Sequence, residues 1–505
     1  MVLTWAAVAV LVGAVSLPAR AVAVVEDNVP AGGVRPADAE GPSLTKSVSQ
    51  HGITWTFDKE VPVGRFVNGD WYVVGPVTVT EIDPKPVQGP DAKSPDDKPR
   101  DDGKYARNGS ALNLPARDRM GFDSRMPLGR YDPALFEAPP FALKPGDSLV
   151  STISVEKTHV TPRMMRPSDK CQVPVKTAAV LTCVAAKVPD DTFRPSMHDR
   201  GNTLYLARNL RRHLLPSVKI PEAARKGQRG LDVLHKVRPA SWDHTDPAIW
   251  TRVFERPWID VCFDGLSSPV ENMPQYGREI SRAVGSGALL LCTDIKAEEK
   301  EPLLVNMVQV GIDLWGAVRA GHHGWPAHGG HGHGRKLLIV FAGYMLNNTD
   351  MMNPYRKHPE ARFSEDQQTV YGKCWTGARV MYGGHVGKDG LKGKTGWGLY
   401  ENLHPKDWPA QIGESYRRCC VSHCWIAEAM AIRLLKMEKA WNHPAFLDYC
   451  DRWMNEDDAE HLKTIKEAKD WDFSQEWNRQ RQAWDPFAQV MYETYRRQCG
   501  PMNWK

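Results

Sequence analysis

The sequence has little net charge and, beyond its first residues, no long apolar run. Its 65 Lys and Arg nearly balance 60 Asp and Glu, which gives a net charge of +5 over 505 residues. So small an excess of base disfavours a dedicated nucleic-acid-binding protein, although a locally basic cleft for an acidic ligand is compatible with it. The 42% of hydrophobic residues excludes wholesale disorder. At roughly 150 residues per domain, the length predicts about two to four domains.

Several widespread catalytic motifs are missing as well. The sequence has no P-loop, no Gly-x-Ser-x-Gly elbow, no His-Glu-x-x-His pair and no EF-hand loop. A dinucleotide enzyme is disfavoured because no strand–Gly-x-Gly-x-x-Gly–helix unit occurs. Zinc is a poor interpretation of the 10 cysteines, which form no pair of Cys-x-x-Cys knuckles. Buried thiols with one or two bridges are favoured instead, and Cys171 and Cys183 could close a hairpin across a strand-like segment.

The first residues predict export. Residues 5–17 form a short apolar run followed by small residues at Ala-x-Ala spacing, which is typical of a cleavable secretory signal. We expect a signal over 1–23, a mature chain that begins near Val22 or Val24, and a linker over 24–49. The Lys or Arg that usually precedes the apolar run is missing, so an uncleaved anchor is the alternative. No later stretch approaches the ~20 apolar residues that span a bilayer, so we expect a secreted or periplasmic protein with no membrane span after cleavage.

The hydrophobic pattern divides the rest of the chain into a β part and a helical part. Alternating apolar and polar residues predict strands, with Asn68 and Gly69 as a turn, in a β-sandwich-like domain over 50–200. A connecting segment over 201–242 leads to a mainly helical domain over 243–505, which makes the class α+β. The expected strands are 53–58, 70–82, 149–156 and 175–186. The expected helices are 202–214, 240–254, 280–293, 302–320, 336–346, 424–437 and 444–454.

The densest cluster of reactive side chains is a Gly- and His-rich segment, 321–336, between two predicted helices. It holds His322, His323, His328, His331 and His333. Glycine lets the backbone approach a ligand closely, and imidazole supplies an acid, a base or a metal ligand near neutral pH. We interpret the segment as a catalytic or substrate-binding loop. The alternatives are a divalent-metal site, although the spacing is not a standard ligand pattern, and a flexible surface loop.

Three further groups could contact a hydroxylated or acidic ligand. The segment FSEDQQTVY (363–371) collects acids, amides and a tyrosine, and its alternative is a helix N-cap with solvated acids. The segment NMPQYGR (272–278) precedes a predicted helix. In Tyr416-Arg417-Arg418, the adjacent arginines could clamp a carboxylate or simply begin a charged helix. The candidates that follow the first segment are Arg379, Tyr382 and His385.

The helical part, about residues 243–500, resembles polysaccharide lyases built on a helical (α/α) toroid with an accompanying β-sandwich. The segments that carry the resemblance are NMPQYGREIS (272–281), WPAHGGHGHGRK (325–336), FSEDQQTVY (363–371), and ESYRRCC and WNHPAFLDYCDRW within 414–453. The resemblance implies a toroid-like catalytic domain in a secreted lyase. Its expected substrate is an anionic, uronate-containing polysaccharide that is cleaved by β-elimination without a cofactor.

Such a lyase must neutralise the C6 carboxylate of a uronate, remove the C5 proton and protonate the leaving oxygen. The resemblance implies that Asn272 or Arg335 performs the first task, His331 the second and Tyr371 the third. We therefore expect His331 and Tyr371 to face a shared pocket, with Arg335 nearby. The residues implied to bind the substrate are Tyr276, Arg278, Trp325, His328, Tyr382, His385 and Arg417.

Two other functions stay open at this point. A glycoside hydrolase would need two carboxylates about 5–10 Å apart across a cleft, and Glu365 or Asp366 with Asp407 or Glu414 are the candidates. A non-catalytic carbohydrate-binding or envelope protein would need neither. Of the three, only a lyase produces an unsaturated sugar, which absorbs ultraviolet light.

Overall fold

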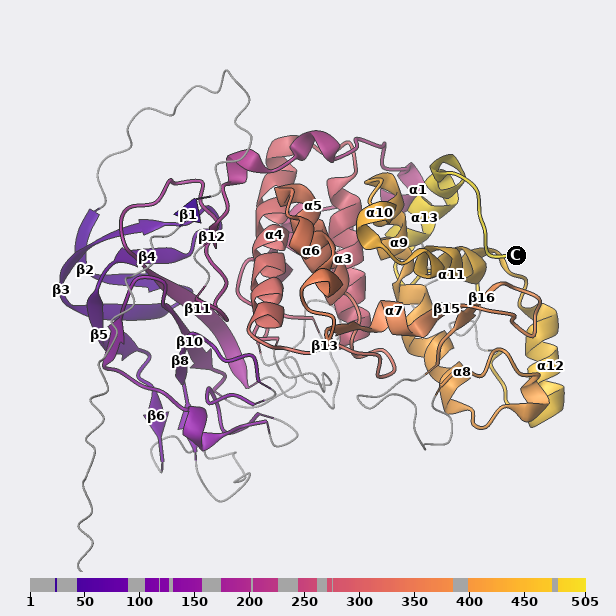
Figure 1. The fold of residues 1–505 in the computed structure, drawn as a ribbon, viewed down its shortest axis with the longest axis horizontal. Coiled ribbons are helices and arrows are strands. Elements are labelled where there is room, and N and C mark those ends of the chain that lie inside the picture. Colours follow the sequence, from indigo (N-terminus) through magenta and orange to yellow (C-terminus); the bar gives the residue numbers. More distant parts are fainter. Residues whose placement is uncertain are drawn as a thin grey trace, which may run out of the picture.

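The computed structural model describes the backbone of residues 23–24 and residues 43–89, 105–117, 119–126, 130–156, 174–200, 203–225, 244–260, 270–274, 276–384, 398–474 and 480–505. Almost all of the predicted signal, most of the predicted linker and His385 lie outside the described residues. Strands fill the first half of the chain and helices most of the second, and the two parts lie side by side in Figure 1. The predicted α+β class is therefore confirmed.

An eight-stranded sheet dominates the first half. Seven strands follow the order β8-β10-β11-β4-β3-β5-β9, and β2 pairs with β3 off this path. Neighbouring strands in this sheet run antiparallel, except that β11 and β4 run parallel to each other. The strands are β2 (Ser43–Gln50), β3 (Ile53–Arg65), β4 (Trp71–Val74), β5 (Val77–Asp83), β8 (Ser110–Leu112), β9 (Phe141–Leu143), β10 (Ser148–Ser154) and β11 (Val175–Val184). Two separate two-stranded sheets are also present. In one, β1 (Ala23–Val24) pairs with β12 (Thr203–Leu204), and in the other, β6 (Val87–Gln88) pairs with β7 (Ala106–Arg107).

The alternation in β3 explains how the sheet buries one face. Ile53, Trp55 and Phe57 are fully buried, while the residues between them are partly exposed. The Trp55 indole donates to Ser151 Oγ at 3.0 Å, which satisfies its polar atom inside the core. Burial of such large side chains is the main stabilising contribution of this face.

The strands differ from the prediction in their limits. The early half of the long strand β3 pairs with β5 and its late half with β4, so β3 joins these described strands in one sheet. The run 70–82 is divided at Pro76, which has no N–H for the ladder, and β2 begins inside the predicted linker. Cys183 has a free, buried thiol in β11, and Cys171, its suggested partner, lies outside the described residues.

The other face of the sheet joins the helical part. Val150 and Val180 point away from the first core and pack in a second apolar cluster with Ile259 and Val270 from the later chain. A buried arginine, Arg194, ties the two parts more directly. Its Nε donates to Asp70 at 2.6 Å and its Nη1 to Asp313 in α4 at 3.0 Å.

Helices make up most of the second half. Asp246 and Asp485 cap two of them by accepting a hydrogen bond from the second helical N–H, with proline in the first position. The longer helices are α2 (Pro247–Phe254), α3 (Gly277–Leu291), α4 (Ala297–Arg319), α5 (Arg335–Leu346), α9 (Ile426–Leu434), α11 (Pro444–Asn455), α12 (Ala459–Lys469) and α13 (Pro486–Tyr495). The short ones are α1 (Glu222–Arg225), α6 (Thr349–Met352), α7 (Ser364–Gln368), α8 (Ile412–Tyr416) and α10 (Glu438–Trp441).

Most predicted helices are confirmed, with two corrections. The described residues 203–214 form a short strand and two 3₁₀ turns and no α-helix, and Arg208 and Arg212 pair with Asp191 and Glu301 elsewhere in the chain. Helix α4 starts at Ala297, so Pro302 lies inside it and not in its first turn. The helices α12 and α13 were not predicted.

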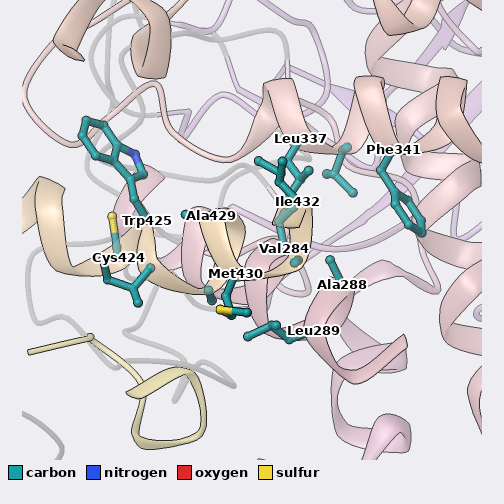
Figure 2. Close-up of a cluster of buried hydrophobic side chains, with 14 of the residues drawn as sticks. Val284, Ala288, Leu289, Leu337, Phe341, Cys424, Trp425, Ala429, Met430 and Ile432 are labelled. Atoms are coloured by element: carbon teal, nitrogen blue, oxygen red, sulfur yellow. The ribbon is translucent and has the colours of Figure 1, made fainter. Parts of the chain in front are cut away.

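Three helices share one core, and their first turns meet. Figure 2 shows apolar side chains of α3 (Val284, Leu289), α5 (Leu337, Phe341) and α9 (Ile432) in this core. The N-terminal ends of α3, α5 and α9 come together at one end of this core. Gly334, which precedes α5, lies against Ser281 of α3, because a Cβ on it would be 2.7 Å from Ser281 N. The Ser281 hydroxyl in turn donates to the carbonyl of Cys424, just before α9. Because helix N-termini carry a partial positive charge, this end favours acidic groups.

Two short strand pairs hold the loops of the helical part. β13 (Gly324–Trp325) pairs with β14 (Arg362–Phe363), and β15 (Thr369–Tyr371) pairs with β16 (Val380–Tyr382). Together they bring the Gly- and His-rich loop beside 363–371, although the two are far apart along the chain. Among the described helices, none has the length and apolarity needed to cross a bilayer.

Candidate functional site

The Gly- and His-rich loop is a packed element. Most of its side chains are buried, which contradicts the alternative of a flexible surface loop. Arg335 holds the loop: its Nε and Nη2 donate to Asp260 at 2.7 and 3.1 Å, and its Nη1 donates to the carbonyls of His331 and His333 at 2.8 and 3.0 Å. The start of α3 also lies against it, since a Cβ on Gly277 would come within 2.2 Å of the His331 carbonyl oxygen.

Three rings gather where the loop meets α3. The His331 ring lies 5.1 Å from that of Tyr276 in an edge-to-face contact and 4.9 Å from that of His328. Tyr276 and His328 are half-buried, whereas His331 is only 7% exposed. Burial raises the pKa of Tyr276 well above its usual value, so its phenol is protonated at neutral pH and can act as a proton donor.

Arg278 completes the group, and its guanidinium is incompletely paired. Its Nε donates to Glu279 Oε1 at 3.1 Å and its Nη1 to the Cys419 carbonyl at 3.0 Å. The guanidinium lies 4.3 Å from the Trp484 ring centre and 5.4 Å from that of Tyr276. Within the described residues its Nη2 is buried and has no hydrogen-bond partner. A buried donor left unpaired is costly, so this nitrogen is a suitable binding point for an acidic oxygen.

A bridge between neighbouring cysteines, Cys419 and Cys420, lines the same place. A Cβ on Gly330 would lie 2.6 Å from the Cys420 carbonyl oxygen and 2.8 Å from the Tyr276 hydroxyl, so only glycine fits there. The loop, the disulfide and Tyr276 therefore form one contiguous surface. We call Tyr276, Arg278, His328 and His331 the loop site.

Behind the loop site, His333 belongs to the core. Its Nε2 is 2.8 Å from Gln368 Oε1, and Gln368 Nε2 donates to the Tyr382 hydroxyl at 3.0 Å. Burial lowers the pKa of His333 to about 3, so the ring is neutral. Because Tyr382 is fully buried in this chain of hydrogen bonds, its predicted contact with substrate is not supported by its position.

Two carboxyl groups are buried under the helix N-termini. Glu365 Oε1 accepts from the Gly334 N–H at 2.6 Å, and Glu428 accepts from the Ser281 hydroxyl. Burial raises the pKa of Glu365 to about 7 and also raises that of Glu428, where the nearby Glu365 adds to the effect. Glu365 is therefore partly neutral near pH 7.

Three other predicted site residues are buried and have their contacts within the protein. Asn272 donates to the carbonyls of Val253 and Arg256 at the end of α2. Trp325 is 0% exposed and packs beside Phe363. Arg417 binds Glu414 and the Tyr449 hydroxyl, each at 2.9 Å. Their predicted contacts with substrate stay predictions, and their burial favours a role in packing.

Tyr371 lies apart from the loop site, so the expected pocket shared with His331 is not formed by the described residues. Its ring is 44% exposed, and its hydroxyl donates to Asp448 Oδ2 at 2.7 Å. It faces a pocket of about 400 Å³ whose other lining residues are Gly372, Lys373, Gly377, Ala378 and Arg379. Burial and the Asp448 carboxylate raise the pKa of Tyr371 to about 12. The short strand β15 ends at Tyr371, which points its ring outward.

Most of the carboxylates proposed for a hydrolase already have hydrogen-bond or ion-pair partners within the protein. Asp366 accepts from Lys336 Nζ at 2.5 Å and from Tyr355, while Glu414 binds two arginines and Tyr400. Asp366 and Glu414 are therefore held by partners within the fold. No group of three His, Cys, Asp or Glu within the described ranges is arranged to hold a metal ion.

Several residues of the site were missed in the sequence. Trp484 reaches Glu279 Oε2 at 3.3 Å across 205 positions of the chain, and His423 stacks on Trp484 at 4.7 Å. The sequence signal for structure near Trp484 is Asp485-Pro486, which is typical of the start of a helix. Comparison of the chain with family models, with curated proteins and with solved structures gave no match.

Proposed function

We propose that the protein is a secreted polysaccharide lyase that cleaves an acidic, uronate-containing glycan by β-elimination at the loop site, with its helices in an (α/α) toroid-like arrangement. The observation that carries the proposal is the unpaired Nη2 of Arg278 beside the ring pair of Tyr276 and His331. A binding point for an anion and two groups that transfer protons thus lie side by side. A lyase for uronates needs that combination.

The chemistry follows from these three side chains. Arg278 pairs with the C6 carboxylate and stabilises the negative charge that develops on it when the C5 proton leaves. His331 accepts this proton, and the C–H electron pair forms the C4–C5 double bond as the bond from C4 to its oxygen breaks. Tyr276, protonated because burial raises its pKa, donates a proton to the leaving oxygen. One proton is removed and one delivered, and transfer from His331 to Tyr276 restores both groups.

His328 and the disulfide surface are assigned to substrate positioning. His328 is half-buried next to His331, and Cys419 and Cys420 are also half-buried, with Cys420 and Tyr276 both close to Gly330. These groups border the place where the sugars next to the cleaved bond would lie. Asn272, Arg335 and Arg417, which already have partners, then support the site from behind.

Substitutions at the loop site test the proposal once an anionic polysaccharide that is cut has been found. Tyr276→Phe removes one hydroxyl and keeps the ring, so turnover should fall by about 10²-fold or more while binding largely persists. His331→Gln should behave alike. Tyr344→Phe is the matched control, because Tyr344 donates to the Leu435 carbonyl on another part of the helical domain. Normal turnover in either loop-site variant would remove that residue from the mechanism.

The scheme uses only side chains of this chain, so chelation of divalent ions should leave activity unchanged. The measurement is turnover before and after treatment with a chelator, with zinc and calcium added back separately. Complete loss of activity that either ion restores would instead favour the metal interpretation of the Gly- and His-rich loop.

A further inference from the structure

We infer that the pocket beside Tyr371 is a second binding site, which takes an anionic sugar ring of the substrate through Tyr371, Lys373 and Arg379. The inference rests on the proposed function for the class of ligand, an acidic saccharide. It gives Tyr371 a role in binding and not in proton transfer. The pocket has a volume of about 400 Å³ and its described lining contains no residue of the loop site.

The cations at this pocket differ from the buried arginines of the chain. Most buried arginines are neutralised by carboxylates, as Arg452 is by Glu401 and Arg496 by Asp451. By contrast, Lys373 and Arg379 are exposed, and neither side chain has a carboxylate partner among the described residues. Two unpaired cations at one concave surface favour an anionic ligand, through carboxylate or sulfate oxygens.

The aromatic ring points to a sugar and not to a bare anion. Tyr371 is one of the few large, exposed side chains in the described structure, at 44% exposure. An exposed tyrosine ring offers a flat apolar face for the C–H face of a pyranose, while the nearby cations bind its acidic group. The Arg379 guanidinium lies 5.2 Å from the ring centre, so the apolar and charged parts of the surface are adjacent.

The backbone holds these groups in a fixed hairpin. Tyr371 ends β15 opposite Val380 of β16, and the Gly372 N–H donates to the Arg379 carbonyl at 2.9 Å. Gly377 makes the turn with φ of +89°, and the Arg379 N–H donates to the Trp504 carbonyl at 3.0 Å. The Tyr371 hydroxyl is fixed to Asp448 of α11. Little conformational entropy is then lost when a ligand binds, which favours affinity.

Direct titration tests the pocket without relying on turnover. The full chain carrying Tyr276→Phe, which slows cleavage by about 10²-fold, is titrated calorimetrically with a glucuronate tetrasaccharide, a chondroitin sulfate tetrasaccharide, cellotetraose and free sulfate. Binding of either acidic saccharide should be weakened at least about fivefold by Arg379→Ala and by Tyr371→Ala, and by less than about twofold by Tyr371→Phe. Arg117→Ala, at an exposed cation of the β part, is the control. Comparing the two acidic probes shows whether carboxylate or sulfate is preferred.

Three results of the titrations would overturn the inference. They are equal binding of cellotetraose, equal binding of free sulfate, and unchanged binding of both acidic saccharides in Arg379→Ala. A fall in turnover of about 10²-fold for Tyr371→Phe in the otherwise unmodified enzyme, with binding intact, would also overturn it, because Tyr371 would then be a proton-transfer group. Binding at this pocket in a protein that cleaves no polysaccharide would refute the proposed lyase function and leave the second site standing.

Discussion

Glu365 and Glu428 are the side chains whose burial has the clearest consequence for stability. The pKa of Glu365, ordinarily 4.5, is raised to about 7 by burial, so the folded state binds its proton more tightly than the unfolded chain does. The stabilising effect of this proton is full below pH 4.5 and is lost as the pH rises through about 7. Near neutral pH the buried carboxyl therefore makes unfolding easier.

Glu365→Gln should remove much of this pH dependence. Glutamine keeps an oxygen that can accept from the Gly334 N–H, and it carries no charge above pH 7. We expect the free energy of unfolding of the variant to exceed that of the wild type by on the order of a few kcal/mol at pH 8, and the two to converge at pH 4. Urea unfolding followed by tryptophan fluorescence measures this difference. A difference that grows towards low pH would contradict the assignment.

The site shows which residues a sequence can place and which it cannot. Tyr276, Arg278, His328 and His331 were all predicted, because each stands in a short motif at a loop or a helix start. Arg335 was predicted to neutralise the C6 carboxylate of a uronate, yet it binds Asp260, 75 positions away, and a sequence pattern does not reveal such a distant partner. Tyr371 was expected beside His331, but the β15–β16 hairpin points it into a separate pocket.

The contact between α3 and the Gly- and His-rich loop has a measurable consequence. Gly277→Ala would place a methyl group within 2.2 Å of two carbonyl oxygens of the loop, those of Gly330 and His331. The variant should lose about 1–3 kcal/mol of stability and, because the loop carries His331, should also lose most of its turnover.

A second glycine serves as the control for that variant. Gly311→Ala would clash in a similar way, at 2.4 Å from the Leu338 carbonyl oxygen, but between α4 and α5. It should lower stability by a comparable amount and leave the turnover of the folded fraction nearly unchanged. Thermal unfolding and the specific activity of the folded fraction measure the two effects. Equal loss of activity in both variants would show that α3 does not position the loop.

The elements themselves were predicted well where periodicity was long. Helix α4 extends over 23 residues and its apolar pattern was clear, whereas the predicted helix over 202–214 is two 3₁₀ turns. The single predicted strand over 70–82 is two strands, which pair with different halves of β3 and are separated at Pro76.

Across the whole molecule, Arg194 couples the sheet to the helices. Its guanidinium is about 1% exposed and binds Asp70 of the β part and Asp313 of α4. Arg194→Leu would leave two buried carboxylates without their cation, which should cost about 3–5 kcal/mol. We expect a lower melting temperature and separate unfolding of the two parts. Differential scanning calorimetry detects the second transition.

Arg194→Leu combined with Asp70→Asn and Asp313→Asn provides the control, since it removes the orphaned charges. Part of the lost stability should return. Unchanged, single-step unfolding of Arg194→Leu would show that the apolar contacts of Val150, Val180, Ile259 and Val270 suffice to couple the two parts.

The most direct test of the lyase proposal is the ultraviolet absorbance of an unsaturated uronate during digestion of a panel of anionic polysaccharides. The panel contains alginate, glucuronan, pectin, ulvan and glycosaminoglycans. We expect the absorbance to rise steadily with at least one of them, and Tyr276→Phe to reduce the rate by about 10²-fold while Tyr344→Phe does not. New reducing ends without any absorbance change would indicate hydrolysis, and no rise on any member of the panel would contradict elimination at the loop site.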